Sequence, residues 1–359
     1  MPLECLEARQ FRNLQTASIR LTHGIQLVYG DNASGKTSLL EAMHVLCGGK
    51  SFLAASARKM QQFGSDAFSI SGLSTQRDHP PQRLRYRWQA GHIHLEAGSE
   101  IVRRTSQYAA IQPVQAITPL SYKIIDDRPE IRRRFMDWGV FHVKQEYSSI
   151  WRQFQRCLNQ RNSLLHRGAD PHAISAWNKE YVRQAEALHS YRHDYMNQLQ
   201  PILASISERL LAKKRLSVRY TAGWDREKGL SQLLEDNLQR DLERKFSYYG
   251  PQRADFSIHL DGHTARDTAS RGQKKLITFA LYLAQASLQQ AIGHKKALLL
   301  IDDLPSELDT QHQAVILQVL QDSSMQAVIS CINPGHLAFA ANEPEKRFHV
   351  KHGRVTEVV

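Results

Sequence analysis

The sequence has little of what marks secreted, disulfide-stabilised or membrane-spanning proteins. Only four of its 359 residues are cysteine, and they are scattered without a Cys-x-x-Cys pair, which favours a reducing compartment. Its apolar runs, such as residues 297–301, are far shorter than the roughly 18 residues that a transmembrane helix needs. The N-terminus shows no basic segment followed by an apolar one, so no signal peptide is predicted. We therefore expect a cytoplasmic protein without a membrane span.

Composition and charge then narrow the class of protein. Hydrophobic residues make up 42% of the chain and charged residues 23%, which is ordinary for a folded globular protein and excludes wholesale disorder. The length favours two domains. Forty-seven Lys and Arg residues stand against 35 Asp and Glu residues, for a net charge of +12. A basic balance of this size is a first indication of a polyanionic partner.

Turn and periodicity signals divide the chain into three parts. Alternating apolar residues predict short strands near the N-terminus, followed by an antiparallel meander over 67–104. Between 129 and 214 glycines are rare and apolar residues recur at helical steps, with a kink or interruption expected at Pro201. Strand signals then return. The simplest organisation is a split α/β domain interrupted by a helical lobe, with boundaries at 1–120 and 246–359 for the α/β part and 121–245 for the helical lobe.

A complete phosphate-binding motif follows the buried strand predicted at 25–29. The segment matches G-x-x-x-x-G-K-[ST] and precedes an apolar helical run, which is the context the motif requires. Its glycines let backbone N–H groups curl round phosphates, and the helix N-terminus adds partial positive charge. We expect Lys36 to reach the β- and γ-phosphates of ATP and Thr37 to ligate Mg²⁺. The residues assigned to nucleotide binding here are Gly30, Asp31, Asn32, Ala33, Ser34, Gly35, Lys36 and Thr37.

A phosphate loop needs an acidic metal partner at the end of a buried strand, and residues 298–303 (LLLIDD) supply one. We expect Asp302 to hold Mg²⁺, directly or through water. Asp303 stands where a carboxylate that polarises the attacking water is wanted. Aspartate is one methylene shorter than the glutamate usual there, which places its carboxylate about 1.5 Å further from the water. Because hydrolysis is sensitive to misplacement of roughly 1 Å, we expect slow turnover.

Residues 268–273 (TASRGQ) and 305–309 (PSELD) flank this strand as the signature and post-carboxylate motifs do in ABC-type ATPases, which this set resembles. The resemblance implies that the signature contacts the γ-phosphate held by an opposite subunit. The residues concerned are Ser270, Arg271, Gly272 and Gln273. Gln115 resembles the glutamine that such enzymes place near Mg²⁺ and the attacking water. Their switch histidine has no counterpart near Ser330, so that role is unfilled or taken by Ser330.

Four further segments resemble the RecF family, in the SMC-like branch of these ATPases. Residues 11–13 read Phe-Arg-Asn, like the family's opening, and residues 129–138 (PEIRRRFMDW) resemble its P-x-x-R-R-x-F-L-D-W motif. Residues 158–165 (LNQRNSLL) are similar to its L-K-Q-R-N-x-x-L motif, and residues 250–255 (GPQRAD) continue the match. The resemblance runs in order over essentially the whole chain. It adds Arg12 to the expected nucleotide-binding residues.

This resemblance implies a fold, an activity and partners. The expected fold is an ABC-type P-loop ATPase lobe, with a mixed sheet and an antiparallel β subdomain, and an inserted helical lobe. The implied activity is ATP-dependent homodimerisation on DNA, whether double-stranded, single-stranded or at junctions, with slow DNA-stimulated ATP hydrolysis. Cooperation with RecR, and functionally with RecO and RecA, in gap repair and the SOS response is also implied, in the cytoplasm and at the nucleoid.

The basic residues gather in particular segments, which gives the expected DNA surface. Segment 121–167 has ten basic residues against five acidic ones, and segment 201–220 has five against one. Contacts through such residues position a protein on phosphates without reading sequence. The residues chosen as DNA contacts are Arg132, Arg133, Arg134, Arg152, Arg156, Arg161, Lys213, Lys214 and Arg215. No cluster of histidines, cysteines and acids suggests a metal other than Mg²⁺.

Two other interpretations stay open at this point. An ABC transporter ATPase subunit shares the nucleotide motifs, although the Arg-rich insertion and the missing switch histidine disfavour it. A DNA scaffold that binds ATP without hydrolysing it is also compatible with Asp303. A pull-down that captures either membrane permeases or gapped DNA would separate the transporter subunit from the DNA-repair ATPase. Measuring phosphate release with and without DNA would separate the scaffold from it.

Overall fold

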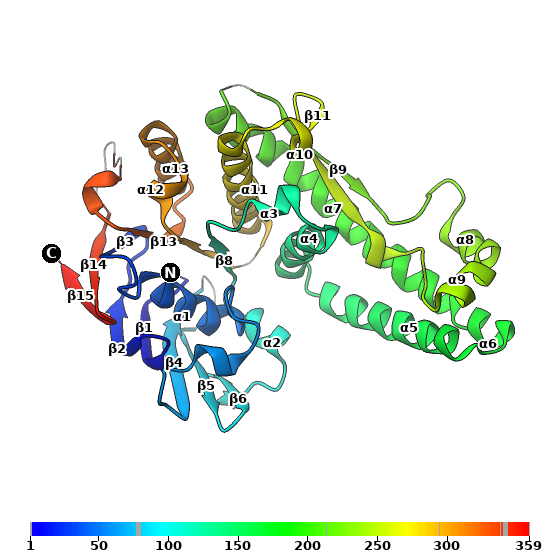
Figure 1. Ribbon diagram of the computed structural model, residues 1–359, viewed down its shortest axis with the longest axis horizontal. Coiled ribbons are helices and arrows are strands. Elements are labelled where there is room, and N and C mark those ends of the chain that lie inside the picture. The colour runs from blue at the N-terminus through cyan, green and yellow to red at the C-terminus, as the bar shows by residue number, and fades with distance from the viewer. Residues whose placement is uncertain are drawn as a thin grey trace. The chain divides into compact units, whose positions relative to one another are not determined.

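The computed structural model describes residues 2–76, 80–212, 214–293, 295–337, 339 and 344–358, which form two compact units (Figure 1). Unit 1 comprises Met1–Tyr122, Ile206–Lys213 and Ser270–Val359, and unit 2 comprises Lys123–Ser205 and Lys214–Ala269. Residues 246–269, assigned to the α/β part from the sequence, lie in unit 2. The reason is that β10 (Asp255–Leu260) pairs antiparallel with β9 (Leu216–Thr221) of that unit.

Unit 1 is built around a six-stranded sheet with the order β15-β14-β3-β13-β12-β8. Strands β14, β3, β13, β12 and β8 are parallel neighbours, and β15 pairs antiparallel with β14. Parallel strands buried on both faces read as continuous apolar runs, as the fully buried β12 does. The strands are β3 (Ile25–Tyr29), β8 (Val114–Ile117), β12 (Leu298–Ile301), β13 (Gln326–Cys331), β14 (Lys346–Lys351) and β15 (Arg354–Val358).

A second, antiparallel sheet of unit 1 has the order β2-β1-β4-β5-β6-β7. Its strands alternate buried and exposed residues, as expected for a sheet with one face on the core. In β5, Leu84, Tyr86 and Trp88 are buried and the intervening arginines are exposed. This sheet contains the predicted meander. The strands are β1 (Cys5–Phe11), β2 (Leu14–Arg20), β4 (Ala67–Ser74), β5 (Gln82–Gln89), β6 (His92–Ala97) and β7 (Glu100–Ile101).

Helix α1 (Lys36–Gly48) packs against strands of both sheets and contributes Leu39, Leu40 and Met43 to their shared core. Helix α11 (Arg271–Ile292) contacts β8 of the parallel sheet. Because α1 begins where the phosphate loop ends, the core that holds this helix also fixes the loop. The remaining helices of unit 1 are α2 (Thr105–Ala109), α12 (Leu304–Glu307) and α13 (Thr310–Asp322), with 3-10 turns η1 (Ala57–Met60) and η3 (Pro334–His336).

Unit 2 is mostly helical, with one three-stranded sheet of order β11-β10-β9, where β11 is His263–Thr264. Its longest helix, α7 (Asn178–Leu210), runs on into unit 1 and continues through Pro201, so the predicted interruption is wrong. Leu199 and Leu203 on either side of the proline are fully buried, and this packing offsets the missing hydrogen bond. The other elements are α3 (Lys123–Asp126), α4 (Pro129–Val143), α5 (Tyr147–Arg167), α6 (Pro171–Ser175), α8 (Leu230–Asp236), α9 (Leu238–Arg244), η2 (Pro251–Arg253) and α10 (Ala265–Thr268).

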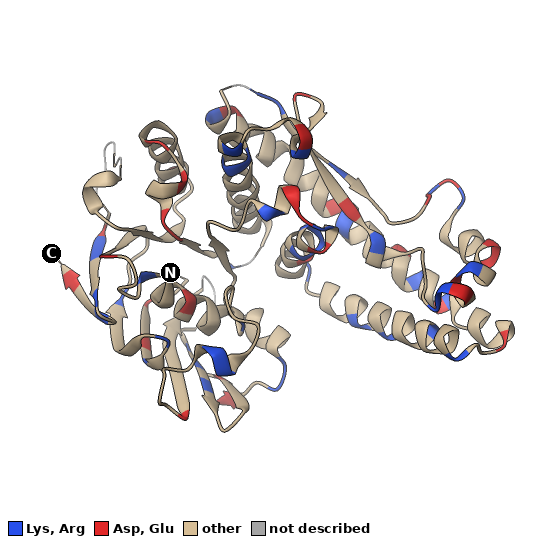
Figure 2. Ribbon diagram, viewed as in Figure 1, with Lys and Arg blue, Asp and Glu red and all other residues tan. Residues whose placement is uncertain are grey.

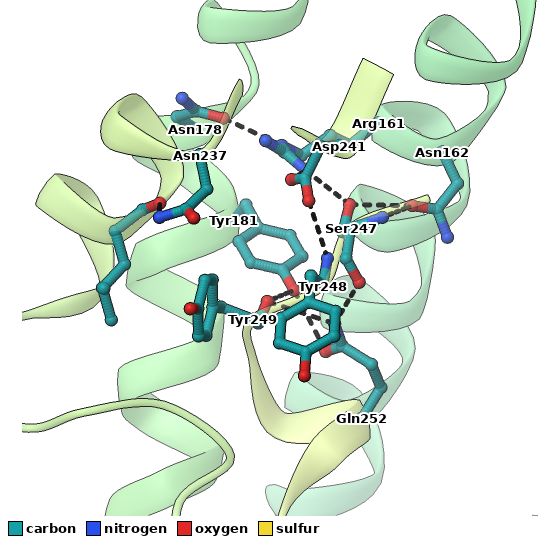
Figure 3. A network of polar contacts seen from close by, with 11 residues as sticks. Arg161, Asn162, Asn178, Tyr181, Asn237, Asp241, Ser247, Tyr248, Tyr249 and Gln252 are labelled. Carbon is teal, nitrogen blue, oxygen red and sulfur yellow. Dashed lines mark hydrogen bonds and ion pairs between the residues drawn. The ribbon is translucent and has the colours of Figure 1, made fainter. Parts of the chain in front are cut away.

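A buried ionic network joins the helices of unit 2 (Figure 3). The Arg161 guanidinium on α5 donates to Asp241 Oδ2 on α9 at 2.7 Å, to Ser247 Oγ at 2.6 Å and to Asn178 Oδ1 on α7 at 3.0 Å. Both charged side chains are fully buried. Asp241 Oδ1 in turn accepts from the Tyr248 N–H at 3.1 Å. A buried charge is tolerated when it is paired and hydrogen-bonded, and residues of three helices and one loop pair this one, while Arg161 Nη2 is left without a hydrogen-bond partner.

Removing one member of the buried pair should destabilise unit 2. We predict that Arg161→Leu lowers the free energy of unfolding by about 3–5 kcal/mol, because Asp241 is left buried without its cation. Denaturant midpoints measure the change. Arg156→Leu, one turn earlier on α5 and exposed, should change the free energy by no more than about 0.5 kcal/mol. Equal midpoints for the two variants would contradict the assigned role of Arg161.

Candidate functional site

The phosphate loop, residues 30–37, connects β3 to α1 in unit 1. Gly30 has φ +149° and a Cβ there would lie 2.2 Å from the Val350 carbonyl oxygen, so only glycine fits. Gly35 has φ +120° and Ala33 has φ +61°. No side chain caps the N-terminus of α1, so its first backbone N–H groups are available to an anion. The loop therefore combines a tight backbone curve with donors, as the motif predicts.

Lys36 lies across this loop. Its Nζ donates to the carbonyl oxygens of Gly30 at 2.8 Å and Asp31 at 2.9 Å, and its side chain is nearly buried. Ser34 Oγ is buried and has no hydrogen-bond partner. An unpartnered buried hydroxyl costs free energy unless a ligand or water satisfies it. The ammonium and the hydroxyl both suit phosphate oxygens.

The Asp302 carboxylate lies opposite the start of α1. Thr37 Oγ1 is 3.1 Å from both carboxylate oxygens, and Ser330 Oγ on β13 donates to Asp302 Oδ1 at 2.7 Å. Burial raises the pKa of Asp302, and the hydrogen bonds from Ser330 and Thr37 oppose that rise. A hydroxyl and a carboxylate in contact are oxygen ligands of the type that Mg²⁺ prefers, so the donor set fits this ion.

Asp303 occupies a special backbone position next to Asp302. Its φ of 55° and ψ of 51° lie in the left-handed region, which Asp and Asn adopt more readily than other non-glycine residues. Its N–H donates to Ser330 Oγ at 2.8 Å. Ser330 thus bridges the carboxylate of one aspartate and the backbone of the next. From the sequence, Ser330 was a candidate only because it lies where ABC-type ATPases carry their switch histidine.

The predicted signature residues begin α11 and are exposed, except for Gln273, which is half-buried. Ser270 caps the helix: its Oγ accepts from the Gln273 N–H at 3.3 Å, while its own N–H donates to Gln273 Oε1 at 2.9 Å. Lys275 one turn later pairs with Glu307 on α12 at 3.2 Å. The capping box holds Ser270, Arg271 and Gly272 at an exposed helix N-terminus joined to the segment after Asp303.

Arg12 lies beside a pocket that the sequence motifs did not reveal. Its guanidinium makes a two-pronged contact with the buried Glu41 carboxylate, at 2.7 and 2.8 Å, and donates to the Lys59 carbonyl oxygen at 2.7 Å. Phe63 beside it is fully exposed. The pocket has a volume of 570 Å³ and is lined by Arg12, Asn13, Ser38, Lys59, Gln61, Gln62 and Phe63. Residues 59–63 match no motif, and an exposed aromatic can be recognised only in the fold.

Gln115 does not lie where the resemblance placed it. It is buried within β8, opposite Leu299 of β12, and its amide donates to Gln285 on α11. Asp302 follows the end of β12, and its backbone N–H donates to the carbonyl oxygen of Ile117, the last residue of β8, at 2.9 Å. Since strand residues alternate in direction and Gln115 stands before the strand end, its side chain packs against a helix. The prediction that Gln115 approaches the metal and the attacking water disagrees with this placement.

Three of the arginines chosen as DNA contacts are internal to unit 2. Arg161 is the buried centre of the network described above. Arg132 is buried, pairs with Asp255 at 2.8 Å and donates to backbone carbonyl oxygens of the α3 region. Arg133 donates to the Ala254 carbonyl oxygen at 2.9 Å and pairs with Glu130. The guanidinium groups of Arg132 and Arg161 are taken up by ion pairs with distant residues, and that of Arg133 by a local ion pair and a distant carbonyl oxygen.

The other basic residues chosen from the sequence are exposed. Helix α5 carries four arginines and no acidic residue, and all but Arg161 are exposed (Figure 2). Lys213 lies outside the described residues. The exposed members are Arg134, Arg152, Arg156, Lys214 and Arg215.

The parallel sheet carries a phosphate loop after β3 and a carboxylate after β12, with β13 between these two strands. Together with the serine-capped helix α11 that precedes β12 in the chain, they define a P-loop ATPase of the ABC type. A family model for an AAA domain matches residues 5–243. The DNA replication and repair protein RecF of Shewanella piezotolerans is 37% identical over 100% of both chains, and RecF of Pseudomonas aeruginosa is 35% identical over 99% of this chain and 98% of its own. The chain belongs to the RecF family of DNA replication and repair proteins.

Solved structures agree on the fold. The recombination mediator protein RecF with ATP, of the RecFOR pathway, superposes with a TM-score of 0.86 at 23% identity, covering 100% of this chain and 98% of that one. An Smc head bound to the C-terminal winged-helix domain of ScpA gives a TM-score of 0.63 at 15% identity, covering 100% and 97%. Within the described residues, no helix is long and apolar enough to cross a membrane.

The hairpin of β14 and β15 supports the phosphate loop from outside. The Gly353 N–H in its turn donates to the Ser34 carbonyl oxygen at 2.8 Å. Gly353 has φ +74°, and a Cβ there would lie 2.0 Å from the Asn13 carbonyl oxygen. Asn13 Nδ2 donates to the Ala33 carbonyl oxygen at 3.2 Å. Three separate segments of the chain therefore meet at the loop.

We predict that Gly353→Ala displaces the phosphate loop and weakens nucleotide binding by roughly tenfold. This corresponds to a loss of about 1.4 kcal/mol in binding free energy. Titration with a fluorescent ATP analogue measures the effect. Gly91→Ala is the matched control: Gly91 also has positive φ, at +87°, but a Cβ there has no neighbour within 4 Å. Both variants carry the backbone strain, and only Gly353→Ala displaces Asn13, which donates to the loop at Ala33. Equal losses of affinity in the two would show that the hairpin does not support the loop.

Proposed function

We propose that the chain is an ATP-controlled DNA-binding switch, in which ATP joins two copies on DNA and its slow hydrolysis releases them. The observation that carries the proposal is the contact of Thr37 with Asp302 beside the phosphate loop. Such a pair provides a hydroxyl and a carboxylate next to a cradle of backbone donors. Membership of the RecF family supports the repair role.

The nucleotide would be held from two sides. Backbone donors of the loop and Lys36 would bind the phosphates, with Ser34 Oγ gaining the partner it lacks. Thr37 and Asp302 would hold Mg²⁺, which when bound neutralises charge on the β- and γ-phosphate oxygens. The pocket beside Arg12 would take the ribose and base, with Phe63 as an exposed aromatic surface for the base. Solved RecF structures with ATP support this assignment.

Hydrolysis would depend on Asp303. In this proposal its carboxylate orients the water that attacks the γ-phosphate, while Ser330 fixes the position of both aspartates. The short side chain and the constrained left-handed backbone limit how far the carboxylate reaches. Slow turnover follows, so that ATP serves as a timer for a closed dimer. A scaffold that binds ATP without hydrolysing it is the remaining alternative.

The dimer would form through the exposed start of α11. Ser270, Arg271 and Gly272 are held at an exposed helix N-terminus by the capping box, and a helix N-terminus favours phosphate. In this proposal each copy offers this end to the γ-phosphate bound by the other copy. ATP then contributes to the interface itself.

DNA would bind through exposed basic side chains of unit 2, stimulating hydrolysis. The exposed face of α5, with Arg152 and Arg156 and no acidic residue on the helix, supports this. Such contacts release counterions and read no sequence. We extend the proposal to action with RecR, and functionally with RecO and RecA, in gap repair and the SOS response at the nucleoid. The RecFOR pathway named for a solved relative supports it.

ATP-dependent dimerisation is testable with two variants. We predict that Ser270→Arg binds ATP as the wild type does but stays monomeric, because the larger cation blocks the opposite γ-phosphate. Lys36→Ala should bind no ATP and also stay monomeric. Gel filtration with light scattering, with a slowly hydrolysed ATP analogue and with or without gapped DNA, gives the mass. A dimer of Ser270→Arg in the presence of ATP would refute the composite site.

The role of Asp303 is separable from folding. We predict that Asp303→Asn keeps ATP affinity within about twofold and lowers the rate of phosphate release by 100-fold or more, since general-base contributions are typically 10²–10⁴. Asn tolerates the same left-handed backbone as Asp, so the turn is preserved. Phosphate release is measured with and without DNA. An unchanged rate would assign the water-orienting role elsewhere, and zero release by the wild type would favour the scaffold.

A further inference from the structure

Three arginines of unit 2 surround one tyrosine. The guanidinium carbons of Arg240, Arg253 and Arg244 lie 4.1, 4.9 and 5.4 Å from the centre of the Tyr248 ring. These four residues are called the arginine–tyrosine cluster. Arg244 and Arg253 are exposed, while Arg240 and Tyr248 are half-buried. Since all three cations contact one ring, they lie within roughly one Debye length of each other, which is about 10 Å at 0.1 M salt.

The charge of the cluster is not neutralised. Among the described residues, no ion pair or side-chain hydrogen bond involves Arg240, Arg244 or Arg253. Lys245, which ends α9 in the left-handed conformation, adds a further exposed cation next to them. Glu243 is exposed on the same helix, but its carboxylate forms no ion pair with the cluster. Two other exposed arginines of unit 2 do have partners: Arg183 pairs with Glu180, and Arg226 pairs with Glu186.

Holding three like charges together costs free energy, and the fold supplies the restraint. Each cation–π contact contributes roughly 0.5–1 kcal/mol at an exposed site, which partly offsets the repulsion. The tyrosine is fixed by the buried network: its N–H donates to Asp241, which Arg161 holds. Figure 3 shows its ring turned away from that pair. Ser247 before it and Tyr249 after it are also fixed, by Asn162 and Tyr181.

We propose that the arginine–tyrosine cluster is a binding site for the phosphate backbone of DNA, with Tyr248 as the rigid support that orients the guanidinium groups. Guanidinium forks match phosphate oxygens with two parallel hydrogen bonds. One DNA strand presents a charge about every 3.4 Å along the duplex axis, so a cluster of this extent faces two or three successive phosphates. The site reads no bases, because the faces of Tyr248 are already occupied by arginine.

This inference rests on the proposed DNA binding and deepens it. The sequence assigned DNA contact to Arg161 because it is basic. In the structure Arg161 instead holds the segment from which the cluster is presented. DNA fits better than an acidic protein segment because three closely spaced guanidinium forks suit the regular spacing of phosphates. If the cluster instead bound an acidic protein segment, removing the cluster would leave binding to naked DNA unaffected.

The test compares two charge-matched double variants of the full-length protein. We expect Arg244→Gln with Arg253→Gln to weaken binding of a fluorescent 30-base-pair duplex by tenfold or more in the presence of ATP analogue. The slope of log K against log salt should fall by about 1.8, since each phosphate contact contributes about 0.9. Arg183→Gln with Arg226→Gln removes the same charge from paired arginines and should change neither quantity. ATP binding and the thermal midpoint should match the wild type in both.

Tyr248 provides a second test without a change of charge. Tyr248→Phe keeps the aromatic ring and should bind DNA like the wild type, whereas Tyr248→Leu should lose affinity by several-fold at an unchanged midpoint. If the Arg244 and Arg253 double variant binds DNA with the affinity and salt slope of its control, the inference is wrong. If the wild type itself binds no DNA with ATP present, the proposed function fails, and this inference fails with it.

Discussion

The Asp302 carboxylate, shared between Thr37 and Ser330, is the interaction on which the rest of unit 1 depends. Its two partners follow or lie in strands β3 and β13, and Thr37 is 265 residues away in sequence. They meet because β3, β13 and β12 are consecutive parallel neighbours, so their carboxyl ends lie at one edge. The register of that sheet therefore sets the spacing of loop and carboxylate. A slip by one residue would turn Asp302 away.

Unit 2 also depends on carboxylates with defined partners, but there they pair with buried arginines and hold helices together. Arg132, Arg161 and Arg192 each pair with a carboxylate and have side chains that are at least 90% buried. The bonds join helices α4, α5 and α7 to β10, α9 and one another. Such pairs give little net stability against an apolar packing alternative, but each one joins two elements at defined atoms. Basic residues thus serve two purposes here: inside, they fix the helices, and outside, they give the surface its charge.

Local patterns in the sequence predicted the backbone features of the candidate site, but they did not predict the long-range partners. Gly30–Thr37, Asp302 and the Ser270 cap were predicted because each is encoded by adjacent residues with a defined backbone. Arg132, Arg133 and Arg134 are consecutive and chemically alike, yet only Arg134 is exposed. What distinguishes them is Asp255 and Ala254, more than 100 residues on. The pocket at Lys59 and Phe63 and the burial of Gln115 likewise depend on tertiary contacts, which the spacing of residues in the sequence does not reveal.

The hydrogen bond from Gly353 to Ser34 has a consequence for biosynthesis. The phosphate loop leaves the ribosome long before the hairpin that supports it. A nascent chain that has not yet released β13, β14 and the Gly353 turn lacks the neighbours of β3 on both sides. Since chains emerge from the N-terminus onward, premature termination before residue 353 would yield chains that carry the motif but an unsupported loop. Tight nucleotide binding would then require a chain that extends through the hairpin.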